Sequence, residues 1–404
     1  MLNGFEFEQA TMKSVILALA LTSCSALTPR EELAKSVNDL KTTWTAKVGS
    51  DASKPLHSSR HLYGVLEGSR EEFEALTKIP GSGFEMAPKL TPEEVEAMDI
   101  PDSFQSSEHW PQCAQVINDI RDQSNCGCCW AFGGASAASD RACIASNGSI
   151  FAPFSAEDIC FNANINGCNG GTVHAPWSYI KNTGVVTGGQ NLEDIAVNES
   201  LPPSDPFYMQ GFCSPFELPH CHHHGDQGND PYPAEGEEGC ESQSSPRGPT
   251  ECDPSALGDH ANFTTDKYTF QGSITGYPRD AATIQAAIMT DGPVEAAFTV
   301  YSDFETYEGG IYQQTSHVPE GGHAIRIVGW GSENGTDYWT VANSWNPYWG
   351  ENVCAFFTHS LIAFSTLVFD FLLFPFFLVL LNLSSKNMSH HIVLEKHTKK
   401  MTSS

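Results

Sequence analysis

Cysteine is the residue that most constrains how this chain can fold. The chain has 404 residues and 13 cysteines, most of which fall between Cys113 and Cys252. Cysteines at this density are typical of disulfide-bonded domains that fold in an oxidising compartment. The length leaves room for a processed N-terminal part and one large domain or two fused halves. A formal net charge of −28 argues against nucleic acid or an anionic membrane as a partner, and the carboxylates are spread along the chain as on a solvated surface.

The first 26 residues have the pattern of a secretory signal peptide. Lys13 precedes the apolar run 15–21, and small residues end at Ala26, where cleavage is expected. Two glutamates stand before this run, so we expect translation to start at Met12. A short buried helix is the alternative, which the length of the run disfavours. Four N-x-S/T sequons agree with passage through the secretory pathway: Asn147, Asn198, Asn262 and Asn334.

Residues 27–100, which we refer to as the N-terminal segment, differ in composition from the residues after them. They contain no cysteine, whereas the chain from Pro101 onward is denser in Cys, Gly and Trp. Thr28 to Glu31 has the pattern of a capping box with proline at the first helical position. Apolar residues then recur at helical spacing up to Trp44, which predicts an amphipathic helix. The change near Pro101 predicts a domain boundary and a removable segment.

The first candidate catalytic residue is Cys129, in the run Cys126-Gly127-Cys128-Cys129-Trp130. An alanine-rich stretch at 131–145 predicts a helix, so Cys129 is expected at or near its N-terminus. The helix dipole and a nearby imidazolium both favour thiolate, which is the nucleophilic form. Gln123 lies six residues upstream, and its amide can act with the backbone N–H of Cys129 as an oxyanion donor.

Two further candidates, His323 and Asn343, occur on strand-like runs far along the chain. His323 follows two glycines, the second being Gly322, which let a substrate backbone approach closely. Asn343 ends the strand-like run 338–343. A strand pair would bring its amide oxygen to one nitrogen of His323 and leave the other facing Cys129. Trp345 would cover this hydrogen bond.

Each motif has a plainer interpretation when taken alone. Cys126 and Cys129 form a C-x-x-C, which suits a redox pair or half a zinc site, but no second pair lies at ligand spacing. Cys129 alone suits a half-cystine, His323 a core histidine, and residues 222–224 a polar loop or a metal-binding tract. The three sites together favour nucleophilic catalysis without a metal or organic cofactor.

These motifs together resemble the papain-like cysteine proteases and, within them, cathepsin B. Residues 126–130 match the family signature C-G-[SA]-C-[WY] except at Cys128. Further matches lie at 42–44, 108–113, 120–123, 168–171, 292–295 and 301–304, and the likeness covers about 27–352. The resemblance implies an α+β fold of two subdomains: a helical half with Cys129, and a β-rich, barrel-like half with His323 and Asn343. It also implies a cleft between them that binds peptide.

The resemblance implies roles for individual residues. The catalytic set is Cys129, His323, Asn343 and Gln123, and the substrate-binding set is Gly170, Gly171, Trp345, His223 and His224. The two histidines belong to residues 221–240, which resemble the occluding loop of cathepsin B. In that family the histidine pair binds the C-terminal carboxylate of a substrate, which allows dipeptide release as well as internal cleavage.

Two positions depart from the family pattern of this loop. An arginine and an aspartate that pair in cathepsin B are replaced here by Asn229, or a neighbour of it, and by Tyr348. Asp122, the family's partner for the first loop histidine, is retained opposite His223. We therefore expect the loop to open more easily, with internal cleavage favoured over dipeptide release.

Spacing alone does not determine the disulfides. The resemblance implies the pairs Cys113–Cys143, Cys126–Cys168, Cys213–Cys252 and Cys221–Cys240, and it leaves Cys128 and Cys160 over. It also implies peptide or protein substrates, a monomer, and inhibition by the N-terminal segment until this is removed, under acid. The expected destinations are a lysosome, another acidic vacuole or the extracellular space.

The tail, residues 353–404, does not match the sequence pattern of the papain-like proteases. It is rich in Phe and Leu and then basic, and residues 361–383 are long enough to span a membrane. Asp370 and Pro375 lie within that span, where a carboxylate is costly. Valine codons begin with GT, as introns do, and a T-rich intron translates as Phe and Leu, so we favour an artefact of the gene model. A genuine tail predicts instead a membrane-anchored or catalytically defective relative that lacks the closing strands.

Overall fold

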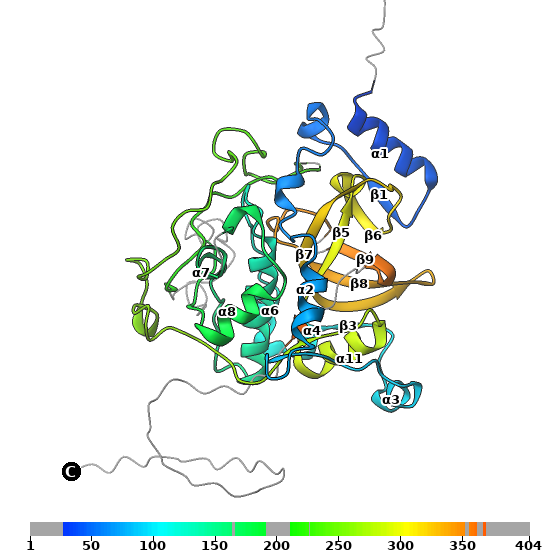
Figure 1. The fold of residues 1–404 in the computed structure, drawn as a ribbon. Helices are drawn as coiled ribbons and strands as arrows, with labels where there is room; N and C mark the ends of the chain where they lie inside the picture. Colours follow the sequence, from blue (N-terminus) through cyan, green and yellow to red (C-terminus); the bar gives the residue numbers. More distant parts are fainter. Residues whose placement is uncertain are drawn as a thin grey trace, which may run out of the picture. The chain divides into compact units, whose positions relative to one another are not determined.

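The computed structural model describes residues 27–163, 166–190, 211–225, 227–351, 355–361 and 367–368. The expected signal peptide and most of the tail lie outside the described residues. Residues Met1–Leu373 form one compact unit, and the rest of the chain, Phe374–Ser404, lies entirely outside the described part. Figure 1 shows α6, α7 and α8 on one side and the strands on the other, with α1, α3 and α11 on the side of the strands.

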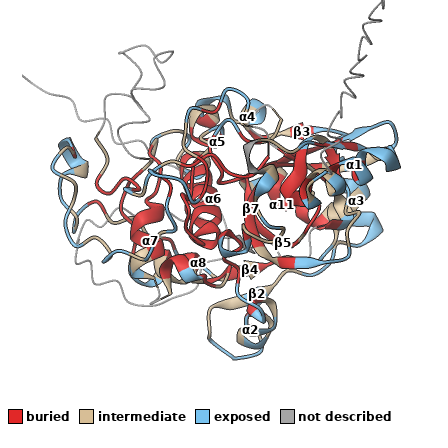
Figure 2. Cartoon of the chain, turned by 90° about the horizontal axis from the view of Figure 1, so that it is seen from above, coloured by how far each residue is buried: buried red, intermediate tan, exposed pale blue. Residues whose placement is uncertain are grey.

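The helical half is built around α6 (Cys129–Ala145), which is buried along nearly its whole length (Figure 2). A helix surrounded by protein has to be mostly apolar, as this alanine-rich sequence is, and its buried charges are paired: Asp140 lies 2.7 Å from Arg326, and Arg141 donates to the Pro293 carbonyl. Gly134 lets the start of α8 pack directly on α6, because a Cβ there would lie 2.4 Å from the Pro176 side chain. The shorter helices of the peptidase region are α4 (Ser106–His109), α5 (Ala114–Ile117), α7 (Ala156–Asn162) and α8 (Ala175–Asn182).

The other half is a mostly antiparallel sheet with the strand order β1-β6-β9-β8-β7-β5-β10-β4-β2. Its central strand, β7 (Pro319–Glu333), pairs antiparallel with β5 (Val294–Tyr301) and β8 (Thr336–Ala342). Helix α11 (Ala281–Asp291) precedes β5. The remaining strands are β1 (Trp44–Ala46), β2 (Phe84–Met86), β4 (Ile274–Gly276), β6 (Tyr307–Tyr312) and β3 (Phe104–Gln105), which pairs with β7 off this path.

The N-terminal segment supplies three helices and both outer strands of the sheet. Helix α1 (Pro29–Leu40) has the predicted capping box: the Thr28 hydroxyl accepts from the Glu31 N–H, and the Glu31 carboxylate accepts from the Thr28 N–H. The other helices are α2 (Ser69–Leu76) and α3 (Pro92–Met98). Strand β1 pairs antiparallel with β6, and β2 pairs parallel with β4. In Figure 1 the segment, in blue, runs along the boundary between the helices and the strands.

Two short strands of the tail belong to this sheet. Strand β9 (Ala355–Thr358) lies between β6 and β8, with Ala355 and Phe357 fully buried. Strand β10 (Leu367–Val368) pairs with β4 and β5. The end of the peptidase domain expected at Asn352 therefore falls before a strand of its sheet, which the apolar run after this residue forms. In the described part of the chain no helix is both long and apolar enough to cross a membrane.

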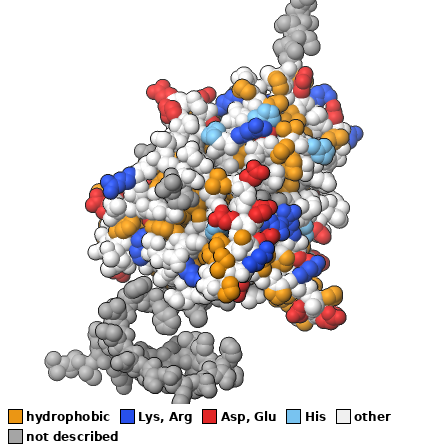
Figure 3. Space-filling view, in the orientation of Figure 1, with side chains coloured by type: hydrophobic (Ala, Val, Ile, Leu, Met, Phe, Trp, Pro, Cys, Tyr) orange, Lys and Arg blue, Asp and Glu red, His pale blue; other side chains and the backbone are white. Residues whose placement is uncertain are grey.

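Five disulfides crosslink the described residues. Four join the pairs that the resemblance implies, and the fifth joins the two cysteines left over: Cys113–Cys143, Cys126–Cys168, Cys213–Cys252, Cys221–Cys240 and Cys128–Cys160. Of the described cysteines, Cys129 is free. On the face that Figure 3 shows, acidic and basic side chains are interspersed.

Candidate active site

Cys129 is the first residue of α6, which confirms its predicted place at a helix N-terminus. Its side chain is fully buried. The sulfur accepts a hydrogen bond from the backbone N–H of Gly64 at 3.2 Å, and the N–H groups of Ala324 and Trp130 also act on it. These three backbone N–H groups stabilise negative charge on the sulfur, so the position favours a thiolate.

His323 and Asn343 come together from neighbouring strands. The imidazole Nε2 and the amide Oδ1 lie 2.8 Å apart, and because this oxygen can only accept, Nε2 carries the proton. The other ring nitrogen, Nδ1, is buried and has no hydrogen-bond partner among the described residues. The Trp345 ring lies 4.7 Å from the imidazole and covers the hydrogen bond. The imidazole therefore presents an unprotonated Nδ1 as a proton acceptor.

Burial keeps this pair uncharged. Desolvation raises the pKa of the Cys129 thiol to about 12, despite the backbone donors around it. Desolvation also lowers the pKa of His323 to about 4, although the hydrogen bond to Asn343 works in the opposite direction. With the N-terminal segment in place, the thiol and the imidazole are both neutral over the whole range between these values.

Gln123 lies at the same centre. Its Nε2 donates to the carbonyl oxygens of Leu62, at 3.0 Å, and Cys126, at 2.8 Å. Its Oε1 accepts from the Ser344 hydroxyl at 2.7 Å, which fixes the amide orientation. The Leu62 carbonyl of the N-terminal segment thus accepts from the Gln123 amide, which was predicted to donate to an oxyanion.

Backbone groups on both sides of the cleft pair with residues 64–66. The Gly171 N–H donates to the Gly64 carbonyl at 2.8 Å, and the Leu66 N–H donates to the Gly171 carbonyl at 3.0 Å. The Val65 N–H donates to the Gly322 carbonyl at 2.9 Å. Gly171 and Gly322 therefore already bind the backbone of the N-terminal segment, whereas the N–H of Gly170, the other predicted pairing glycine, donates to the Gly167 carbonyl at 3.2 Å.

Glycine is required at these positions by close packing. A Cβ at Gly171 would lie 2.5 Å from the Trp130 indole, and one at Gly64 would lie 1.9 Å from the Gly127 carbonyl oxygen. Gly170 has a φ of 103°, which L side chains rarely adopt. The sequence singled out Gly170 and Gly171 but not Gly64, whose role depends on which distant segment enters the cleft.

A buried ion pair fixes the start of the N-terminal segment to the sheet. Arg30, on α1, lies 2.7 Å from Glu305, and their side chains are 1% and 2% exposed. Burial raises the pKa of Glu305 to about 7, although Arg30 opposes the rise. Trp44 adds a second anchor, donating from Nε1 to the Gln313 carbonyl at 2.9 Å. The sequence did not single out Glu305; its only signal is a carboxylate within an aromatic run.

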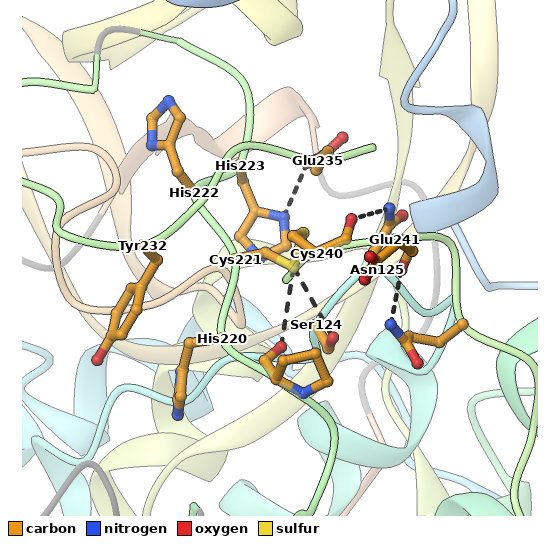
Figure 4. The surroundings of a disulfide bond; sticks show 12 residues. Ser124, Asn125, His220, Cys221, His222, His223, Tyr232, Glu235, Cys240 and Glu241 are labelled. Carbon is orange, nitrogen blue, oxygen red and sulfur yellow. Dashed lines mark hydrogen bonds and ion pairs between the residues drawn. A yellow bond between two sulfur atoms is a disulfide. The ribbon is translucent and has the colours of Figure 1, made fainter. Parts of the chain in front are cut away.

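His223, in the predicted occluding loop, lies between two carboxylates. Its Nε2 lies 2.8 Å from Asp122, and its Nδ1 lies 2.9 Å from Glu235; Figure 4 shows the second contact beside the Cys221–Cys240 disulfide. Burial lowers the pKa of His223, but the two carboxylates outweigh it and raise this pKa to about 9. The same contacts lower the pKa of Glu235 to about 2 against the cost of its burial. Buried ion pairs of His223 with Asp122 and Glu235 thus hold the loop in place.

His224 is also buried, but its electrostatic surroundings differ from those of His223. Burial lowers its pKa well below the usual value, and neither ring nitrogen has a hydrogen-bond partner among the described residues. Its ring lies 4.4 Å from that of Trp345 and 6.4 Å from that of Trp349. Of the two loop histidines, His224 is therefore the one with free donor and acceptor capacity next to the cleft.

The predicted loop lacks one ion pair of cathepsin B, and other contacts are present in that region. Asn346 donates to Asp230 at 2.8 Å, and Asp230 also lies 2.9 Å from His222. The rings of Tyr232 and Tyr348 lie 6.1 Å apart. Easier opening of the loop stays a prediction, since these contacts tie the loop to the segment that follows Trp345 by another route.

One cluster of three cysteines tests the alternative prediction of a zinc site. The sulfur atoms of Cys126, Cys128 and Cys160 lie within 4.8 Å of one another. Each of them is bonded in a disulfide and is not available as a thiolate ligand.

Comparisons with known proteins agree with this geometry. A family model described as "Papain family cysteine protease" matches residues 100–359. Cathepsin B-like cysteine proteinase 4 of Caenorhabditis elegans is 37% identical over 359 residues, 84% of this chain and 92% of the relative. Cathepsin B-like cysteine proteinase 6 of the same organism is 40% identical over 260 residues, 63% of this chain and 61% of its own length.

Solved structures confirm the predicted α+β two-subdomain fold. The structure of proCathepsin B S9 from Trypanosoma congolense superposes with a TM-score of 0.59 at 24% identity, over 81% of this chain and 92% of that one. The fold, the matched family model and the relatives agree: this chain belongs to the papain family of cysteine proteases.

Proposed function

We propose that this chain hydrolyses peptide bonds by acyl transfer through the Cys129 thiolate. The observation that carries the proposal is a free cysteine at a helix N-terminus beside an oriented imidazole, in a cleft whose backbone groups pair an extended chain. The N-terminal segment inhibits the enzyme by filling this cleft. Its removal admits both water and substrate.

The reaction follows from the roles of four residues. His323 takes the thiol proton at Nδ1, and the Cys129 sulfur bonds to the substrate carbonyl carbon. The carbonyl oxygen becomes an oxyanion, held by Gln123 Nε2 and the Cys129 N–H. The C–N bond then breaks as His323 returns its proton to the leaving amine. His323 next deprotonates a water that hydrolyses the thioester, and Asn343 keeps the ring oriented throughout.

Both internal cleavage and dipeptide release belong to the proposal. His224, with its unpartnered nitrogens beside Trp345, supports binding of a C-terminal carboxylate once the site is hydrated and acidic. The altered loop contacts favour internal cleavage as the major activity. An acidic compartment of the secretory pathway is the proposed place of action.

The test is acid activation of the proform followed by hydrolysis of an internally quenched peptide and of a peptide with a free C-terminus. We expect both to be cut, the first faster. Mass spectrometry should detect a thioester on Cys129 when a slowly hydrolysed ester is supplied. Cys129→Ser is the control and should show neither activity nor adduct. An active Cys129→Ser variant would refute the mechanism.

A further inference from the structure

A cavity of about 760 Å³ opens beside the backbone-pairing glycine, Gly171. One part of its wall is the N-terminal segment, through Leu66 and Glu72. The rest belongs to the peptidase domain and includes Thr172, His174 and residues of α7 and α8. The cavity thus adjoins Gly171, where an extended chain pairs. The resemblance assigns Trp345 to the part of the substrate after the cleaved bond, and the cavity lies instead beside the predicted backbone-pairing glycine.

His174 is the distinctive group in this wall. It is 7% exposed, and its Nδ1 is buried without a hydrogen-bond partner among the described residues. Its Nε2 lies 3.3 Å from the Thr172 hydroxyl and 3.5 Å from the Glu72 carboxylate. The rings of Phe73 and Phe84 cover it, at 6.3 Å and 5.8 Å. Phe73, Phe84 and Glu72 belong to the N-terminal segment, whereas Thr172 belongs to the peptidase domain.

Among the described residues, the peptidase-domain part of the wall contains no Asp, Glu, Lys or Arg. It consists of His174 and neutral residues: Asn162, Ala163, Asn166, Gly171, Thr172, Ala175, Ser178, Tyr179, Asn182 and Thr183. Burial lowers the pKa of His174 in the proform, with Glu72 opposing. Removal of the segment takes away the cover, and a hydrated imidazole is protonated below about pH 6.5. The pocket then carries a single positive charge, and the carboxylate that occupied it has left with the segment.

We propose that this pocket binds an acidic side chain of the substrate on the amino-terminal side of the cleaved bond, with His174 as its partner. The proposal rests on the proposed peptidase function and names a substrate class for it. Glu72 shows the arrangement in the proform, where a carboxylate lies against the imidazole within reach of the Gly171 pairing site. A charge-assisted contact of this kind distinguishes Glu from Gln, which has the same shape.

The experiment compares peptide pairs that differ only by Glu or Gln at the second, third or fourth residue before the cleaved bond. For the activated wild type at pH 5.5, we expect kcat/KM for Glu to exceed that for Gln about tenfold at one position. At pH 7.5 the ratio should fall toward one. His174→Gln should bring it near one at both pH values, whereas His317→Gln, a change at an exposed histidine, should keep the wild-type ratio.

The outcomes separate the two claims. Equal cleavage of Glu and Gln peptides at all three positions, or an unchanged ratio in His174→Gln, overturns the pocket assignment and leaves the peptidase intact. Absence of any cleavage overturns the proposed function and this inference with it. The wild-type pH comparison tests the pocket even if the variant does not fold.

Discussion

Gly64→Ala should weaken the hold of the N-terminal segment on the active site. The added Cβ would lie 1.9 Å from the Gly127 carbonyl oxygen, so the two backbones have to separate. Overpacking of this kind costs about 1–3 kcal/mol. Since 1.4 kcal/mol is a factor of ten, the open fraction of the proform should rise about 5- to 150-fold. The Gly64 N–H bond to the Cys129 sulfur is lost in the same movement.

The assay is alkylation of Cys129 by iodoacetamide in the intact proform at pH 7. In the closed form the pKa of this thiol is about 12, because it is buried, so only about one thiol in 100,000 is ionised. Labelling therefore reports opening. Peptide mapping is needed to separate Cys129 from Cys24 and Cys354, which lie outside the described residues.

Glu67→Ala provides the control, since Glu67 is exposed in the same stretch and should leave the labelling rate at the wild-type value. The processed enzyme sets the upper limit. Equal labelling rates for Gly64→Ala and wild type would refute the reasoning, because the segment would then not exclude reagent from the thiol.

Three other variants test separate parts of the structure. Asn343→Ala frees the imidazole of His323 and should lower kcat by about a hundredfold with little change in KM, as measured on the activated enzyme. Arg30→Met leaves Glu305 buried without its cation, so the free energy of unfolding of the proform should fall by about 3–5 kcal/mol, as measured by calorimetry at pH 8. A Tm equal to that of the wild type would contradict the role of the ion pair. Glu235 has a lowered pKa, so its contribution to stability is present above about pH 4.5 and is lost as the pH falls toward 2. Glu235→Gln should flatten the thermal unfolding profile of the proform in that window, and a profile with the wild-type slope would count against it.

The candidate catalytic centre was predictable because each of its residues lies in a short local pattern. Helix-forming sequence after Cys129 fixes this side chain at the start of α6, and Asn343 directly follows the end of β8. His323 lies within β7, a few residues after this strand begins at Pro319. The hydrogen bond between His323 and Asn343 then follows from antiparallel pairing of β7 with β8.

Contacts between distant segments were not predictable in the same way. Nothing near Gly64 or Leu62 marks them as the residues that reach the sulfur and the Gln123 amide. The missing loop ion pair was visible as a departure at Tyr348, but its ring contact with Tyr232 depends on the path of the whole loop. Strand β9 was missed because the resemblance ends before it, although the sequence continues with a short apolar run.

The placement of β1 and β2 at the two ends of the sheet has a consequence for how the protein has to be prepared. Both strands are lost when the N-terminal segment is removed, which leaves β6 and β4 as edges with unpaired N–H and C=O groups. Open edges of this kind recruit further strands, from other molecules if nothing else is available. We therefore expect the segment to protect both edges of the sheet during folding, in addition to covering the active site. Refolding should succeed with the full proform and fail by aggregation when the chain starts at Pro101.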